Sequence, residues 1–133
     1  MDKKEALEIV KDDGYALDTL SEQFKKDRDV VLEAIKRSGM GGLQHADKSF
    51  YKDRDLILTA VMKDGICLNR ADENLKKDKE IVLAALENNG DALADAHDNL
   101  KKDKDIVLVA VKNRGWALQH ANENLKKDRD VVI

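Results

Sequence analysis

The five-residue sequence Asn-Leu-Lys-Lys-Asp occurs three times at intervals of 25 residues, at 74–78, 99–103 and 124–128. Aligning the rest of the chain on this interval divides it into five units and a short remainder: 2–26, 27–52, 53–77, 78–102, 103–127 and 128–133. A fixed period of this length is typical of arrays in which one small supersecondary unit is repeated. The sequence therefore predicts a single repeat domain over residues 1–133.

Two helices are predicted in each unit, one on either side of a glycine. In the fifth unit, apolar residues with helical spacing lie on both sides of the glycine: Ile106, Val107, Ala110 and Val111, then Ala117, Leu118, Ala121 and Leu125. Spacings of one, three and four residues place each set on one side of an α-helix. Helices of about ten and nine residues are too short to be stable alone in water. We therefore expect an all-α protein, an α-solenoid of stacked helix-turn-helix repeats.

Residues at the unit boundaries predict where these helices begin and end. Asp103 precedes the first helix of its unit and is expected to accept a hydrogen bond from the amides of its first turn. Gly115 follows that helix, at a position where glycine adopts a left-handed conformation at low cost. The paired lysines of the recurring sequence lie at the negative end of the second helix dipole. The recurring sequence thus predicts the end of one helix and the start of the next.

Small residues at equivalent positions of the units predict close helix packing. They form two sets: Ala46, Ala71, Ala96 and Ala121, and Ala16, Cys67, Ala92 and Ala117. Cys67 is therefore expected to be a buried equivalent of alanine rather than a reactive thiol. Leu83 and Leu108 are also expected in the core, where truncation to alanine costs about 2–5 kcal/mol. Glu5 replaces an apolar residue in the first unit, which favours a polar cap at that end.

The repeat is similar to a known family of tandem helical repeats. The similarity is carried by DRDVVLEAIKRSG at 27–39, DKEIVLAALENNGDALADA at 78–96 and DKDIVLVAVKNRGWALQHA at 103–121. These segments resemble the DUF4116 domain of unknown function, one domain corresponding to two units, and the resemblance covers nearly the whole chain. The family has no established activity or catalytic residue. Its occurrence in multiple copies implies an interaction scaffold.

Neither the histidines nor the short motifs favour an enzyme. His45 and His120 lie three units apart, about 25 Å if each helix layer adds about 8–10 Å, and His97 has no histidine or cysteine companion. The Asp-x-Asp pairs are not followed by the glycine and glutamate of a calcium loop. Phosphate-binding loops, nucleophile elbows and zinc-protease motifs are absent from the sequence. We expect no enzymatic activity, no cofactor and no metal site.

Charge and hydropathy bear on partners and location. The net charge of −3, from 24 basic and 27 acidic residues, gives no broad positive field for nucleic acid or a membrane surface. No apolar run reaches the roughly 18 residues of a membrane span. The N-terminus also lacks the apolar segment of a signal peptide. We expect a cytoplasmic protein without membrane association.

Positions that vary between units predict a partner-binding edge near the turns between the paired helices. Apolar anchors there would be Tyr15, Met40 and Trp116. The polar candidates are Gln44, His45, Asn69, Arg70, Asn113, Arg114, Gln119 and His120. Free variation of solvated positions is the alternative explanation of this pattern.

Two functions remain open from the sequence. The main hypothesis is a non-enzymatic scaffold that binds an unknown protein partner, as a monomer or a weak end-to-end dimer. The alternative is a nucleic-acid-binding repeat array that uses the lysines of Asn-Leu-Lys-Lys-Asp, and strongly salt-dependent binding would identify it.

Overall fold

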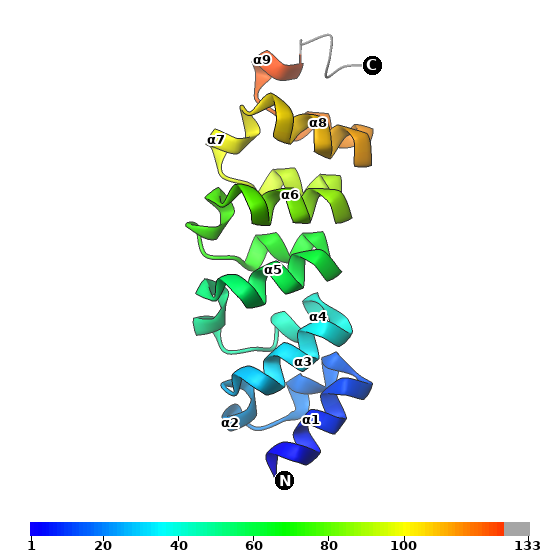
Figure 1. The fold of residues 1–133 in the computed structure, drawn as a ribbon, viewed down its shortest axis with the longest axis vertical. Helices are drawn as coiled ribbons and strands as arrows, with labels where there is room; N and C mark the ends of the chain where they lie inside the picture. Colours follow the sequence, from blue (N-terminus) through cyan, green and yellow to red (C-terminus); the bar gives the residue numbers. More distant parts are fainter. Residues whose placement is uncertain (127–133) are drawn as a thin grey trace.

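The computed structural model describes residues 1–126, and every regular element within them is a helix. The predicted remainder at 128–133 lies outside the described residues. Each unit begins with a regular α-helix, here called its first helix: α1 (Lys3–Asp12), α3 (Arg28–Ser38), α5 (Arg54–Lys63), α6 (Lys79–Asn88) and α8 (Lys104–Asn113). Successive first helices pack against one another, and Figure 1 shows them as layers of an elongated stack. The prediction of an all-α repeat fold is confirmed.

The rest of each unit differs from the prediction of one nine-residue α-helix. In four units the glycine begins a 3-10 helix: η1 (Gly14–Thr19), η3 (Gly65–Arg70), η5 (Gly90–Asp95) and η6 (Gly115–His120). The second unit has a one-turn α-helix there, α4 (Met40–Leu43). A third short element ends each unit: α2 (Glu22–Lys25), η2 (Lys48–Lys52), η4 (Leu75–Lys77), α7 (Asp98–Lys101) and α9 (Glu123–Lys126). The predicted second helix is therefore two short elements.

The spacing of buried residues explains the 3-10 geometry. A 3-10 helix has three residues per turn, so residues three apart remain on one side of it. Gly65, Leu68 and Ala71 follow this interval and are all buried, whereas Ile66 and Asn69 are exposed. With 3.6 residues per turn the same row would rotate away from the first helix. The spacing Gly-x-x-Leu-x-x-Ala also fits an α-helix, because Ala and Leu recur at three and four residues, and this ambiguity explains the wrong prediction.

The boundary aspartates begin the first helices as predicted. The Asp27 side chain accepts hydrogen bonds from the amides of Asp29 and Val30, at 3.0 and 3.3 Å. Asp103 accepts equivalent bonds from Asp105 and Ile106. Each carboxylate satisfies amides that have no partner within the helix, next to the positive end of the helix dipole.

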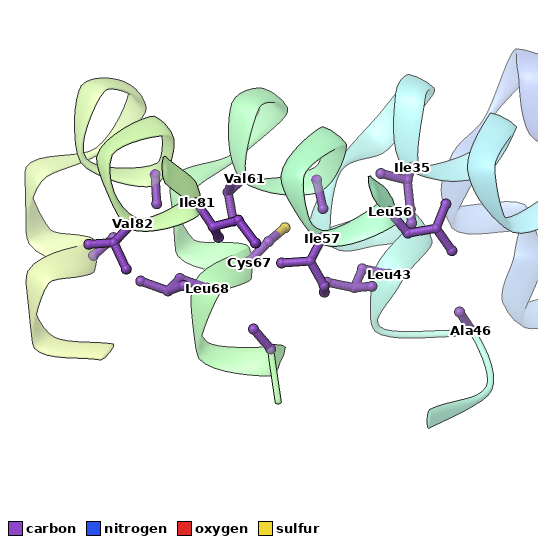
Figure 2. Packing of buried hydrophobic residues seen from close by; sticks show 14 of the residues in the cluster. Ile35, Leu43, Ala46, Leu56, Ile57, Val61, Cys67, Leu68, Ile81 and Val82 are labelled. Carbon is purple, nitrogen blue, oxygen red and sulfur yellow. The ribbon is translucent and has the colours of Figure 1, made fainter. Parts of the chain in front are cut away.

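The core is continuous from unit to unit. The first helices of the second, third and fourth units each bury four residues at the same spacing, in α5 Leu56, Ile57, Ala60 and Val61. Figure 2 shows Ile57, Cys67 and Ile81, from successive elements, pointing into one apolar layer. Cys67 is fully buried, and burial raises the pKa of its thiol to about 12. Cys67 thus packs as the alanine equivalent that the sequence predicted.

Two expectations about packing need correction or refinement. Leu83 and Leu108 are only half-buried, because each follows the buried pair by one residue and so turns about 100° away from the core. Leu86, three residues after Leu83, is the fully buried leucine of α6. Ala16 is half-buried, unlike the other members of its set. Glu5 is exposed, in agreement with a polar first unit.

The glycines after the first helices serve close packing, and the predicted left-handed conformation is wrong for most of them. Gly39 is the one glycine among residues 1–126 with a positive φ, at 51°. At Gly14, Gly65 and Gly90 an added Cβ would lie 2.3 Å from a backbone carbonyl oxygen in the next first helix. A methyl group does not fit between the units there. The inserted residue of the second unit, in contrast, moves Gly39 against the side chains of Lys63 and Asp64.

Candidate functional site: the face of the first helices

The turn edge predicted from the sequence carries exposed apolar side chains, but they do not form one patch. Trp116 is 82% exposed and Tyr15 is 56% exposed, and they lie in the fifth and first units. The Tyr15 ring covers Gly41, where an added Cβ would be 2.6 Å from it. Met40 is half-buried and packs one side against the core.

Polar residues two positions before the glycines join neighbouring units. The Asn113 side chain accepts a hydrogen bond from the Gly90 amide at 2.7 Å and donates one to the Glu87 carbonyl at 2.9 Å. Asn88 forms the same arrangement with the Gly65 amide, at 2.6 Å, and with carbonyls at the end of α5. These bonds satisfy groups that a helix end leaves unpaired. Asn113, predicted as a partner contact, is exposed and also bonds the fifth unit to the fourth.

The other predicted polar residues are distributed along the stack. Asn69, Arg70 and Gln119 are exposed, and Gln44 is half-buried. Arg114 is exposed, with Nη1 3.7 Å from Oδ2 of Asp91. Gln44 lies in the second unit, Asn69 and Arg70 in the third, and Arg114 and Gln119 in the fifth, so these residues do not form one cluster.

Each of the two predicted histidines lies in a polar cleft between units. His45 Nδ1 is 3.3 Å from Asp18 Oδ1, in a cleft of about 420 Å³ that also includes Lys25. His120 lines an equivalent cleft of about 330 Å³ with Lys101. No serine, threonine or cysteine lines either cleft.

The described residues also provide no evident metal site. Within residues 1–126, no three His, Cys, Asp or Glu side chains are grouped so as to hold a metal ion. Asp95 lies near His120 and two lysines, and burial raises the pKa of Asp95 while these neighbours oppose that shift. This carboxylate is balanced by cations and does not belong to an acidic cluster.

An apolar hollow lies on a face that the sequence did not single out. It is a groove of about 520 Å³ between α5 and α6, lined by Leu58, Met62, Glu80, Leu83, Ala84 and Glu87. Leu58 and Met62 are four residues apart on α5, and the α6 residues are spaced at three, four and seven positions, so each set shares one helix side. Met62 is 63% exposed. The groove therefore offers an apolar floor to solvent.

A row of leucines extends this surface along the whole stack. The fifth residue after the boundary aspartate is half-buried leucine in all five units: Leu7, Leu32, Leu58, Leu83 and Leu108. Each leucine packs one side against the core and leaves the other toward solvent. We call this row the leucine row. The signal in the sequence was the same large apolar residue in every unit at a position just off the buried stripe.

The ninth residue after the boundary aspartate distinguishes the groove from the rest of the leucine row. It is lysine in the first, second and fifth units: Lys11, Lys36 and Lys112. Met62 and Glu87 replace lysine in the third and fourth units, and both line the groove. The two departures from lysine therefore fall on neighbouring helices and change the same surface.

Charges around the groove are unequally paired. Arg54 donates to Asp78 at 2.8 Å and to Glu80 at 2.9 Å, and its hydrogen bond lowers the pKa of Asp78. Lys79, the first residue of α6, pairs with Asp103 of the next unit at 3.4 Å. Within residues 1–126 the Glu87 carboxylate forms no ion pair, although the Glu87 carbonyl accepts the bond from Asn113. Glu87 is thus the unbalanced charge at the rim.

The lysines of the unit boundaries are not a uniform positive stripe. Lys25 lies 3.6 Å from Glu22 and Lys76 lies 3.3 Å from Glu73, each within one helical turn. Lys101 pairs in the same way with Asp98, at 3.8 Å. One lysine of each boundary pair is therefore balanced by a carboxylate, whereas the second, Lys26, Lys77 or Lys102, is exposed and forms no ion pair within residues 1–126.

Comparison with known proteins agrees with the repeat. No helix within residues 1–126 is long and apolar enough to cross a membrane. Neither the curated proteins nor the solved structures gave a match. The family model "Domain of unknown function (DUF4116)" matches four overlapping segments, 2–51, 53–101, 82–126 and 103–133, most of which span two units. Together these segments cover almost the entire chain, which belongs to the DUF4116 family.

Proposed function

We propose that this chain is a non-enzymatic repeat scaffold that binds a protein partner on the face formed by its first helices. The observation that carries the proposal is the groove between α5 and α6, where Leu58, Met62, Leu83 and Ala84 form an apolar surface within the leucine row. Apolar surface that is contiguous and rimmed by polar groups marks interaction sites more often than scattered apolar residues do. Binding would cover this surface and remove it from water.

Two further features favour this function over the alternatives. The polar clefts are lined by histidine, lysine and acids but by no serine, threonine or cysteine, which favours a binding role over hydrolysis through a hydroxyl or thiol nucleophile. One lysine of each boundary pair is balanced by a carboxylate, which weakens the attraction for phosphate on which nucleic-acid arrays depend. Nucleic-acid binding remains the alternative, and the exposed second lysines of these pairs, Lys26, Lys77 and Lys102, are the observation in its favour.

Affinity capture with matched variants tests the proposal. The variant Met62→Asp/Leu83→Asp places two charges in the groove, and Asn69→Asp/Gln119→Asp places the same two charges on the predicted turn edge. We expect a partner that is retained by the wild-type chain and by the turn-edge variant but lost by the groove variant. If the groove variant is unfolded by circular dichroism, the single Met62→Asp variant replaces it, because Met62 is largely exposed.

The opposite result would reassign the binding surface or the function. A partner lost only by the turn-edge variant would move the site to the edge that the sequence predicted. Salt-sensitive binding of unrelated DNA or RNA, measured at two salt concentrations, would favour the nucleic-acid alternative. A groove variant that retains every captured protein would refute the proposal.

A further inference from the structure

The groove between α5 and α6 combines an apolar floor with the Glu87 carboxylate, which has no ion-pair partner within residues 1–126, and this combination specifies its occupant. We infer that the groove binds a cationic amphipathic helix of a partner protein, whose apolar residues contact Leu58, Met62 and Leu83 and whose lysine or arginine reaches Glu87. The inference rests on the proposed function and adds the chemistry of the partner.

The shape of the site favours a helix over an extended peptide. An extended segment gains most of its affinity by adding to a free strand edge, and residues 1–126 contain no strand. The groove instead runs between two neighbouring ten-residue helices, each about 15 Å long at 1.5 Å per residue. A surface of this length matches about three turns of a helix with anchors at i, i+3, i+4 and i+7.

The positive charge inferred for the partner helix follows from the residues that replace lysine at the ninth position. Three units carry lysine at the ninth position, and a groove bordered by two such lysines would repel a basic helix. At this groove the same positions are Met62, which is neutral and apolar, and Glu87, which is negative. Glu80 adds a second carboxylate, partly neutralised by Arg54 at 2.9 Å. The local charge is therefore opposite to that of the equivalent positions elsewhere in the stack.

Synthetic peptides of defined charge can test the inference while the natural partner is still unidentified. Three probes of about 14 residues, about four helical turns, are compared: a Leu/Lys peptide with helical amphipathic spacing, a Leu/Glu peptide with the same spacing, and a scrambled Leu/Lys peptide. Binding is measured by titration calorimetry at about 0.15 M salt, and the contact surface is mapped by amide chemical shifts of the chain. We expect the amphipathic Leu/Lys peptide to bind, with shifts centred on α5 and α6.

Two charge-reversing variants separate the groove from general acidity. Glu87→Lys and the control Glu8→Lys change the net charge equally, and lysine is already present at the position of Glu87 in three units. We expect Glu87→Lys to weaken the amphipathic Leu/Lys peptide by about tenfold or more. Glu8→Lys, on α1 and beyond the roughly 8 Å screening length, should change binding by less than about twofold.

Several results would overturn the inference. Equal binding of the scrambled and amphipathic Leu/Lys peptides would indicate charge alone, and equal effects of Glu87→Lys and Glu8→Lys would place the contact outside the groove. Absence of Leu/Lys binding would also overturn it. A Leu/Glu peptide that binds the wild-type groove more tightly would refute the cationic partner while leaving the scaffold function intact. The proposed function itself would be refuted by a different result, namely a groove variant that still captures every partner in the affinity experiment.

Discussion

The glycine that begins a 3-10 helix in four of the units offers a direct test of why the units pack so closely. At Gly90 an added Cβ would be 2.3 Å from the Ala110 carbonyl oxygen of α8. That oxygen cannot turn aside, because it accepts the Arg114 amide at 2.8 Å. At Gly115 no heavy atom of the described chain lies within 4 Å of the added Cβ. Gly90→Ala and Gly115→Ala are therefore the same substitution in two different environments.

The expected difference in unfolding free energy follows from these contacts. Relieving the overlap at Gly90 requires the fourth and fifth units to separate by about 1 Å, and such overpacking costs about 1–3 kcal/mol. The same movement lengthens the Gly90 to Asn113 hydrogen bond, now 2.7 Å, which contributes about 1 kcal/mol. Gly90→Ala should thus lose about 2–4 kcal/mol. Gly115→Ala should stay within about 1 kcal/mol of wild type, on the stabilising side, because alanine restricts the unfolded chain.

Urea denaturation followed by far-UV circular dichroism measures both values. The slope of the unfolding free energy against urea concentration must be compared between the variants as well, since a repeat array can depart from two-state unfolding. If the glycines served only a left-handed backbone, both substitutions would lose a similar amount, about 1 kcal/mol. Equal losses at Gly90 and Gly115 would therefore refute the close-packing explanation.

Three further predictions concern the core, the junction ion pairs and the thiol. Leu86→Ala should cost about 2–5 kcal/mol and Leu83→Ala clearly less, because Leu86 is fully buried and Leu83 half-buried; urea titration compares them, and equal costs would contradict the division between core and leucine row. The Arg54 hydrogen bond lowers the folded pKa of Asp78, so its contribution is present above the unfolded pKa of about 3.9 and is lost as pH falls through the lower folded value. Asp78→Asn should make the urea midpoint less sensitive to pH below about 4, and an unchanged pH profile would argue against the pair. Cys67, with a pKa of about 12, should resist thiol reagents at neutral pH in the folded chain and react fully in urea, whereas rapid reaction without denaturant would contradict its burial.

Features that depend on one unit alone could be predicted from the sequence. The caps at Asp27 and Asp103 require only a carboxylate before a helical stripe, and the stripe itself follows from residue spacing. Burial of Cys67 followed from its alignment with alanines. In each case the determining interaction lies within a few residues of chain.

Features that depend on the next unit could not be predicted. The sequence does not show why position 90 needs a glycine. The cause is the close approach of the Ala110 carbonyl of α8, which is seen only when the distance between units is known. The bridging role of Asn113 could not be predicted for the same reason, since nothing local indicates that it bonds to Gly90 and Glu87. The groove could not be predicted either, because it depends on the half-burial of the leucine row and on the position of Met62 beside α6.

The junctions between units are unequal, and the inequality determines where a rigid binding surface can form. Between the third and fourth units, Asn88 accepts the Gly65 amide at 2.6 Å and Arg54 holds Asp78 at 2.8 Å. Between the second and third units, the Gly39 amide donates to Ile35 of its own helix, and Lys63, at the position of the bridging asparagine, forms no such bond within residues 1–126. A bound helix must fix the separation of the two helices that it contacts, and a junction that is already fixed loses less conformational freedom on binding. The groove between α5 and α6 lies at a junction that is fixed by both kinds of bond, like the junction between the fourth and fifth units and unlike the irregular one, which is the arrangement expected of a preorganised docking surface.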